Sequence, residues 1–528
     1  MQKFTFHRGA TGLFSEQQNR LVYRQEELLS FIDLPYSPAN FIKQVARKSK
    51  TFSTEQRSLL CEVLNETYNG IHLHEKVQQN LELLKEENTY TVTTGHQIPI
   101  FTGPMFFVYK LLHVIRLSEQ LNIENDNFKT VPVYWMATED HDFDEIKWVD
   151  LFNKTIEWNT DQQGPVGRFE LEGFDKVKTE FADFFSGDAL TEIEEILSFY
   201  DGTNFANATL NVVNHLFGKY GLLILNADHP KLKGSFAPVF EKEIESGFSH
   251  AAVVKTDEQL NKEGMKVQVH AREINLFYME NGLRERIIHL DDGFIIDRKG
   301  KLTKSELLDL IRKQPECFSP NVILRPLYQE FILPNLCYIG GVGEIAYWLQ
   351  LKGVFDAVEV PYPMLSVRNS LLWIDSVNSR KIAKIDISLE DLFLDSEDLK
   401  KRYVHRNQSD ELDMTEVESS FKDLKVKLTQ KVMKADPGLE KFVASELVRM
   451  EKQIQGVRDK MFRSIKGKHD QALISIDQVK TKLFPNNGLQ ERSMNLFQLC
   501  AGGKVEERLD QLHHFIDPFE KDFIVIRE

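Results

Sequence analysis

The sequence predicts an α/β protein with a parallel-sheet core, long insertions and a helical coiled-coil domain. Short, nearly continuous apolar segments alternate with helix-like segments between residues 89 and 385. This alternation is typical of parallel strands that helices cover on both faces. After about residue 385 glycine nearly vanishes, and apolar residues recur with heptad spacing. The 528 residues, 42% of them hydrophobic, are enough for a large core.

Residues 1–88 are expected to be mostly helical and to join the core, with Ser53 or Thr54 capping one helix. The core, residues 89–385, carries five apolar segments that we predict as strands, each before a helix or a polar loop. They lie in "YTVTTG", "TVPVYWM", "YGLLILN", "LCYIGG" and "YPMLSV". The spans 150–215 and 250–320 are too long for simple crossovers and are predicted to be insertions. In the second insertion, Asn281-Gly282 and Asp291-Asp292-Gly293 are hairpin signals.

Residues 386–490 are predicted to form an antiparallel coiled-coil hairpin, which "KADPGLE" (434–440) divides into two arms. A plain helical bundle is the alternative. The predicted heptad positions are Val443, Leu447, Met450, Ile454, Val457 and Met461, and after a phase shift Ala472, Ile476, Val479 and Leu483. A single hairpin cannot cover the whole seam, so we expect a homodimer through the coiled coil. The last segment, residues 491–528, is apolar enough to pack back on the core.

Composition excludes several classes of protein. A net charge of -15 and a pI of about 5.6 argue against a broad nucleic-acid-binding face. No window approaches the roughly 20 apolar residues of a membrane span, and the N-terminus lacks a secretory h-region. The cysteines form no CxxC pair, which suits a reducing cytoplasm. They are Cys61, Cys317, Cys337 and Cys500.

The first candidate site is the loop after the first predicted strand, in "TVTTGHQIPIFTGPMFFVYKLL" (91–112). Gly95 ends the strand, His96 and Gln97 follow, and Gly103 precedes an apolar helix whose Lys110 could point back to the loop. A glycine loop before a helix N-terminus exposes backbone N–H groups to an anion. A simple turn between strand and helix is the equally weighted alternative.

The second candidate is "EDHDFDE" (139–145), which follows the next predicted strand. Asp140, His141 and Asp142 are the candidate catalytic residues, with His141 or Asp142 as a general base. Asp142 and Asp144 are candidate Mg²⁺ ligands, acting largely through water. Acidic residues favoured by a helix N-terminus are the alternative interpretation.

Two further strand ends supply candidate binding residues. The glycine-rich "IGGVGEIAYW" leaves backbone amides free and places a glutamate in the first helical turn, while arginine can hold a carboxylate or phosphate bidentately. A surface arginine is the alternative in each case. These candidates are Gly340, Gly341, Gly343, Glu344, Arg325, Arg368 and Asn369.

Together, "TGHQIPIFTGP", "EDHDFDE", "SPNVILRPL" and "GGVGEIAYWLQLK" occur in an order that resembles the cysteine-adding (BshC) family of bacillithiol biosynthesis, over essentially the whole chain. The resemblance implies a Rossmann-like core with connective insertions, a coiled coil and a dimer. It also implies a ligase that adds cysteine to glucosaminyl-malate, with ATP at the loop from Gly95 to Gly103 and Mg²⁺ as a cofactor. The last strand ends in "SVRNS" and lacks a "KMSKS" signature, so adenylation rests on analogy. The alternative function is a non-enzymatic nucleotide-binding sensor or assembly protein whose coiled coil recruits partners.

Overall fold

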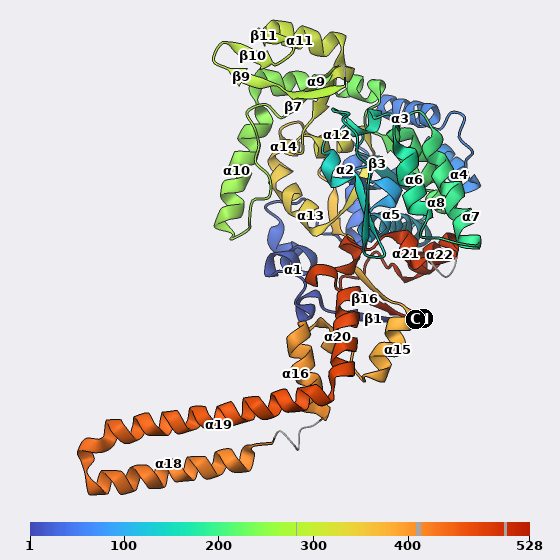
Figure 1. Cartoon of the computed structure of the whole chain (residues 1–528). Helices are drawn as coiled ribbons and strands as arrows, with labels where there is room; N and C mark the ends of the chain where they lie inside the picture. The colour runs from blue at the N-terminus through green and yellow to red at the C-terminus, as the bar shows by residue number, and fades with distance from the viewer. Residues whose placement is uncertain (281, 408–412, 501–503) are drawn as a thin grey trace.

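The computed structural model describes the chain except residues 281, 408–412 and 501–503, and except the side chains of residues 465–468. A globular body carries a long helical hairpin that projects away from it (Figure 1). The centre of the body is a five-stranded parallel sheet in the order β14-β13-β2-β3-β6. Its strands are β2 (Thr89–His96), β3 (Lys129–Met136), β6 (Leu223–Asn226), β13 (Asn335–Gly340) and β14 (Met364–Val367). The predicted parallel core is therefore confirmed.

Helices cover this sheet because its strands are apolar on both faces and almost wholly buried. The helix α5 packs on β2 and β3, and α2 contacts β13. The helices of the core and of the N-terminal region are α1 (Glu16–Tyr23), α2 (Phe41–Lys48), α3 (Thr54–Thr67), α4 (Glu75–Leu83), α5 (Met105–Glu124), α9 (Pro230–Ser246), α12 (Arg325–Ile332), α13 (Val342–Trp348) and α14 (Lys352–Asp356). Ser53 caps α3 with its hydroxyl, as the sequence predicts.

Both predicted insertions contain secondary structure of their own. The first holds the β4-β5 hairpin (Trp148–Leu151, Lys154–Glu157), α6 (Phe174–Ala182), α7 (Asp188–Ser198) and α8 (Phe205–Phe217). The second holds α10 (Phe248–Lys262), β7 (Leu276–Glu280), β8 (Leu283–Arg286), β9 (Ile288–Leu290), β10 (Gly293–Ile296), β11 (Gly300–Leu302), α11 (Lys304–Lys313) and β12 (Phe318–Pro320). The strand pairs β7-β8 and β9-β10 are antiparallel at the two predicted turns, although residue 281 lies outside the described residues.

A second, three-stranded sheet joins the two ends of the chain in the order β1-β16-β15. Its strands are β1 (Gln2–Phe6), β15 (Leu371–Ile374) and β16 (Phe523–Arg527). The expectation of a mostly helical N-terminal segment misses β1. After the last predicted strand, the unpredicted strand β15 comes before the helix α15 (Ser376–Lys384). Both strands pair with β16, whose position more than 150 residues away no local pattern reveals. The last segment does pack back on the core, through β16 and α22 (Val505–Phe515).

The projecting hairpin consists of α18 (Thr415–Ala435) and α19 (Glu440–Lys468), with the break at Asp436-Pro437-Gly438 that the sequence predicts. Ion pairs such as Arg458–Glu418 (3.1 Å) connect its antiparallel arms. Val443 and Leu447 are buried, whereas Val457 is 56% exposed, so the hairpin covers only part of its apolar seam.

The second run of heptad positions does not continue the coiled coil. It lies on α20 (Asp470–Leu483), where Ile476, Val479 and Leu483 are buried against β15, α15 and α16 (Ser396–Asn407). The phase shift in the sequence therefore marks the point where the helical region exchanges one packing partner for another. In the part of the chain that the structure describes, no helix has the length and apolar character needed to cross a membrane.

Candidate active site

A cavity of about 880 Å³ lies beyond the carboxyl ends of β2, β3 and β13. Ligands of open α/β sheets bind at this edge, where successive strand ends and their loops converge. The β7-β8 pair of the second insertion forms another wall through Phe277, Arg284 and Arg286. Of the sequence-predicted residues, those that line the cavity are Gly95, His96, Gln97, Asp140, His141, Arg325 and Glu344. The structure thus brings three candidate loops, each after a different strand, to one place.

An ion pair between a buried lysine and a partly exposed glutamate lies at the inner end of the cavity, which is the end that Gly95 and Glu344 line. Lys110 reaches back from α5, as the sequence allows, and donates to the Gly95 carbonyl (3.2 Å) and to Glu344 Oε1 (2.5 Å). The Glu344 carboxylate also accepts from the backbone N–H of Gly341 (2.9 Å). Burial raises and Lys110 lowers the pKa of Glu344, and the net direction is downward, so this carboxylate stays charged.

Arg325 lies beside Gly95 at the same end and has no carboxylate partner among the described contacts. Its guanidinium donates to the neutral oxygens Tyr347 Oη (2.8 Å) and Gln329 Oε1 (3.3 Å). An added Cβ on Gly95 would lie 3.0 Å from Arg325 Nη1. Since a guanidinium has five N–H donors, Arg325 retains donors for an anionic ligand in the cavity.

His96 is a neutral imidazole in this structure. Burial, and after it the charge of Lys110, lowers the pKa of His96 to about 3. The ring contacts the carbonyl of Gln97 through Nδ1 (2.9 Å), so this nitrogen carries the proton. The Gln97 side chain donates to Asp140 Oδ2 (2.8 Å) and Glu145 Oε2 (2.9 Å), which ties the loop after β2 to the loop after β3.

His141 contacts Arg284 of the second insertion, and this contact occupies one of its two ring nitrogens. Arg284 donates from Nη1 to His141 Nδ1 (2.8 Å) and from Nη2 to the Pro320 carbonyl (2.8 Å). The Arg284 guanidinium also stacks over Phe277, with 4.0 Å between Cζ and the ring centroid. Burial, followed by the charge of Arg284, lowers the pKa of His141, so the ring is neutral with its proton on Nε2.

The predicted metal ligands do not form a metal site. Asp142 and Asp144 are exposed and lie outside the cavity lining, and Asp144 pairs with Lys147 (2.8 Å). Within the described residues, no three side chains of His, Cys, Asp or Glu gather in a group that could hold a metal ion. The residues present therefore do not fit a metal ion held by the protein alone.

Several other predicted binding residues lie away from the cavity. Arg368, at the end of β14, pairs with buried Glu491 (2.7 Å), and Asn369 donates to the Glu520 carbonyl (3.0 Å). Both hold the C-terminal segment against the core, which corrects their assignment as ligand contacts. Gly103 is also outside the lining: its φ of 57° closes a turn, and its carbonyl accepts from Asn495 (2.7 Å).

The glycines after β13 act through packing rather than through the cavity. An added Cβ on Gly340 would lie 3.0 Å from Glu344 Oε2, whereas one on Gly341 or Gly343 meets nothing within 4 Å. None of the three lines the cavity. Their expected contact with a ligand is therefore replaced by a tight turn that positions Glu344.

The cavity lining also includes Glu139, Arg284 and Arg286, which were not among the predicted site residues. Glu139 was part of the acidic run but was not selected, because its burial, which distinguishes it from Asp140, is not visible in the sequence. Arg284 and Arg286 lie in the alternating "LRER" of β8, and no sequence signal connects this insertion to the strand ends. Only the folding of the insertion over the sheet brings them to the site.

The parallel sheet, with a cavity at its carboxyl edge that is lined by charged, aromatic and aliphatic side chains, defines a Rossmann-like α/β protein with a site of small-molecule size. Family models agree with this class and make it more specific. The model described as "Bacillithiol biosynthesis BshC, N-terminal Rossmann-like domain" matches residues 10–369, and that described as "Bacillithiol biosynthesis BshC, C-terminal coiled-coil domain" matches residues 371–528. The chain belongs to the BshC family of bacillithiol biosynthesis.

Similar proteins match along nearly the whole chain. A protein of Flavobacterium johnsoniae is 38% identical over 524 residues, 98% of each chain. One of Flavobacterium psychrophilum is 35% identical over 525 residues, again 98% of each, and one of Christiangramia forsetii is 35% identical over 510 residues, 95% of each. All three carry the name "Putative cysteine ligase BshC".

Proposed function

We propose that this protein is a ligase that joins the carboxyl group of cysteine to the amine of glucosaminyl-malate, the last step of bacillithiol synthesis. The observation that carries the proposal is the whole-length similarity to proteins named as cysteine ligases, within a family of bacillithiol biosynthesis. The bond formed is an amide, because the acceptor offers an amine and cysteine offers a carboxylate.

The chemistry of the cavity supports this proposal. Its volume of about 880 Å³ is within the usual range of small-molecule sites, roughly 300–1,000 Å³. Arg325 keeps free donors at the inner end, and Arg284 and Arg286 lie on the insertion wall. Cations at two ends suit substrates with several anionic groups, here the malate carboxylates and the phosphates of a nucleotide.

Amide formation from a free carboxylate also needs an activated acyl group. We propose ATP as the activating co-substrate, which gives an acyl phosphate or an acyl adenylate of cysteine. Mg²⁺ is expected to enter with the phosphates, because Asp142 and Asp144 form no ligand set without them.

The proposal includes a homodimer that assembles through the hairpin. Large apolar side chains remain exposed on its two helices, and a second copy of the same surface would cover them. Those exposed by 40% or more are Val417, Leu424, Val426, Phe442, Val448 and Val457.

The deciding experiment incubates the purified protein with cysteine, glucosaminyl-malate, ATP and Mg²⁺ and measures the product by mass spectrometry. We expect a cysteinyl amide whose formation matches nucleotide consumption, with ADP or AMP identifying the activated intermediate. Reactions that omit one substrate at a time are the controls. Binding of the substrates without product or nucleotide turnover would contradict the ligase and favour a non-enzymatic sensor.

A further inference from the structure

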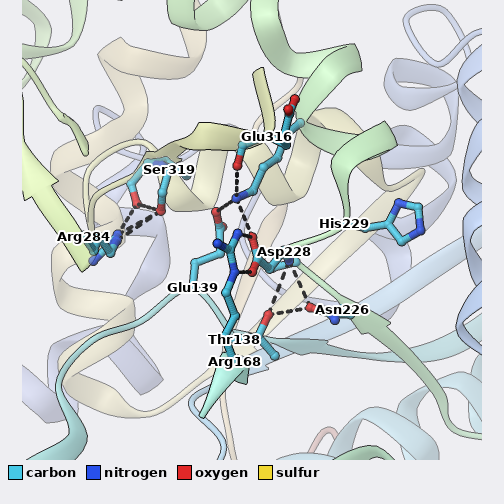
Figure 2. A network of polar contacts seen from close by, with 12 residues as sticks. Thr138, Glu139, Arg168, Asn226, Asp228, His229, Arg284, Glu316 and Ser319 are labelled. Atoms are coloured by element: carbon cyan, nitrogen blue, oxygen red, sulfur yellow. Dashed lines mark hydrogen bonds and ion pairs between the residues drawn. The ribbon is translucent and has the colours of Figure 1, made fainter. Parts of the chain in front are cut away.

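A network of charged side chains includes Glu139, a residue of the cavity lining (Figure 2). Lys233, from α9, contacts Glu139 Oε1 (2.8 Å) and Asp228 Oδ1 (2.5 Å), and Arg168 holds Asp228 bidentately at 2.6 and 2.9 Å. The Lys233 side chain is fully buried, and those of Glu139 and Asp228 are each 7% exposed. Removing the three charges of Lys233, Glu139 and Asp228 from water is costly, although Arg168 is 45% exposed, so this network needs a reason beyond stability.

The members of the network are not equivalent. The Asp228 carboxylate accepts hydrogen bonds from Arg168 and from Lys233. The Asp228 backbone N–H donates to Asn226 Oδ1 (3.0 Å). Lys233 donates in addition to the main-chain carbonyl of Glu316 (3.2 Å). Glu139 is the member that also lines the cavity, and within the described part of the chain Lys233 is the one ion-pair partner of its carboxylate. The Glu139 carboxylate thus faces the cavity, while Asp228 holds its partner Lys233 and Arg168 holds Asp228.

Two other acidic groups of the cavity lining, Asp140 and Glu344, already accept several hydrogen bonds. Asp140 accepts from Gln97 (2.8 Å) and from the backbone N–H of His141 (2.7 Å). Glu344 is bound by Lys110 (2.5 Å) and by a helix-capping N–H. Lys110 and the hydrogen bonds outweigh burial and lower the pKa of Glu344, which makes it a weaker proton acceptor, and both carboxylate oxygens of Asp140 already accept hydrogen bonds.

His141 is also unsuited to accept a proton in this arrangement. Its Nδ1 lone pair accepts the Arg284 hydrogen bond, and its Nε2 carries the ring proton. Glu139 differs, because burial raises its pKa above the ordinary range even though Lys233 acts in the opposite direction. A carboxylate of this kind is better matched to proton transfer near neutral pH than a fully hydrogen-bonded one.

We propose that Glu139 is the catalytic base that takes the proton from the attacking amine during amide formation. This inference rests on the proposed ligase function. The amine nitrogen attacks the acyl carbon of activated cysteine, and its electron pair forms the C–N bond. An N–H bond breaks and its proton moves to the Glu139 carboxylate, while the C–O bond to the phosphate-containing leaving group breaks with its pair on oxygen. Lys233 is a positioning residue that holds the Glu139 carboxylate at the cavity.

The pH dependence of turnover gives a direct test. The charged and titratable groups that face Glu139 come from several elements and are Lys233, Asp228, Arg168, Arg284 and Tyr328. We expect the acid limb of the wild-type profile of kcat/KM to be absent in Glu139→Gln. Turnover should fall by at least about 100-fold, as loss of a general base predicts. Calorimetry should give glucosaminyl-malate affinity within about threefold of wild type, because the substitution keeps the size of the side chain.

The matched control is Glu66→Gln, which removes a carboxylate bound to α9 through Lys231 (2.5 Å) at the surface. Its turnover and pH profile should equal those of wild type. If Glu139→Gln folds poorly, Glu139→Ala with added formate replaces it, and formate should restore part of the lost turnover. Wild-type turnover in Glu139→Gln, or joint loss of binding and turnover without formate rescue in Glu139→Ala, would overturn the inference.

A readout without substrates separates this inference from the proposed function. Infrared difference titration of wild type against Glu139→Gln should show one carboxyl group that protonates above the ordinary glutamate value of about 4.3. A midpoint at or below that value would overturn the inference. Absence of a cysteinyl product from wild type, with this raised midpoint present, would instead refute the ligase function.

Discussion

Replacement of Gly95 by valine should weaken ligand binding while leaving the fold intact. The backbone of Gly95 does not require glycine, since its φ is not in the left-handed region. The requirement is spatial: a Cβ there would lie 3.0 Å from Arg325 Nη1 and 3.3 Å from Gln329 Oε1. The two additional methyl groups of valine extend further, so the Arg325 guanidinium must move out of its position in the cavity.

The magnitude follows from the hydrogen bonds that Arg325 can offer. One hydrogen bond to a charged group contributes about 1.5–3 kcal/mol. Loss of this contact should weaken the affected ligand by roughly 10- to 150-fold, at 1.4 kcal/mol for each factor of ten. Overpacking costs on the order of 1–3 kcal/mol of folding free energy, which a chain with a core this large should tolerate.

Calorimetric titration with ATP and with glucosaminyl-malate measures the effect, and thermal unfolding measures the fold. Gly341→Val is the matched control, because a Cβ on Gly341 meets nothing within 4 Å. Gly103→Ala should show the opposite pattern, with reduced stability and unchanged binding, since Gly103 has a φ of 57° and its Cβ would lie 2.7 Å from Pro99. If Gly95→Val binds both ligands as wild type does, Arg325 holds neither anion and the reasoning fails.

Three other expectations concern stability and assembly. Burial lowers the pKa of His113 to about 3, so the unfolded state binds a proton that the folded state does not. Unfolding free energy should therefore fall as pH drops from about 6.5 toward 3, and His113→Asn should reduce that slope by up to about 1.4 kcal/mol per pH unit; equal slopes in urea titrations would contradict this. Glu491→Gln removes the charged partner of buried Arg368 and should lower the free energy of unfolding by about 3–5 kcal/mol in the same titrations, with ligand affinity unchanged. Weaker ligand binding at unchanged stability would instead indicate that Arg368 contacts a ligand. Light scattering should give about twice 61.3 kDa for wild type and 61.3 kDa for the double variant Leu424→Glu, Phe442→Glu, and a wild-type monomer at micromolar concentration would refute the dimer.

The local patterns of the sequence predict most of the core because the relevant interactions are short in range. The apolar run of β3 ends at Met136 as expected, since strand burial is visible in consecutive side chains. The α3 cap at Ser53 and the break at Pro437-Gly438 are likewise local. The strand β1 was missed because its five residues depend on pairing with β16 at the other end of the chain.

The candidate site was predictable only in part, for the same reason. Gly95, Asp140 and Glu344 follow apolar strands, and parallel strands bring their carboxyl ends to one edge, so the sequence already implies that these residues meet. Chemical type alone, however, does not distinguish Arg325 from Arg368. The first lies beside neutral oxygens in the cavity and the second is paired with Glu491, and that difference depends on the packing of a distant segment.

The order of apolar and helical segments, the glycine turns and the heptad spacing are properties of neighbouring residues, and they specify the class of fold and the projecting hairpin. Contacts between segments far apart in the chain decide three other features. These are the position of the β7-β8 wall, the burial of Glu139 with Lys233, and the packing of α20 on the second sheet. The physical reason is that backbone preference and side-chain periodicity act over a few residues. Burial, by contrast, and with it the charge and pKa of a carboxylate, is created only when distant segments exclude water from it.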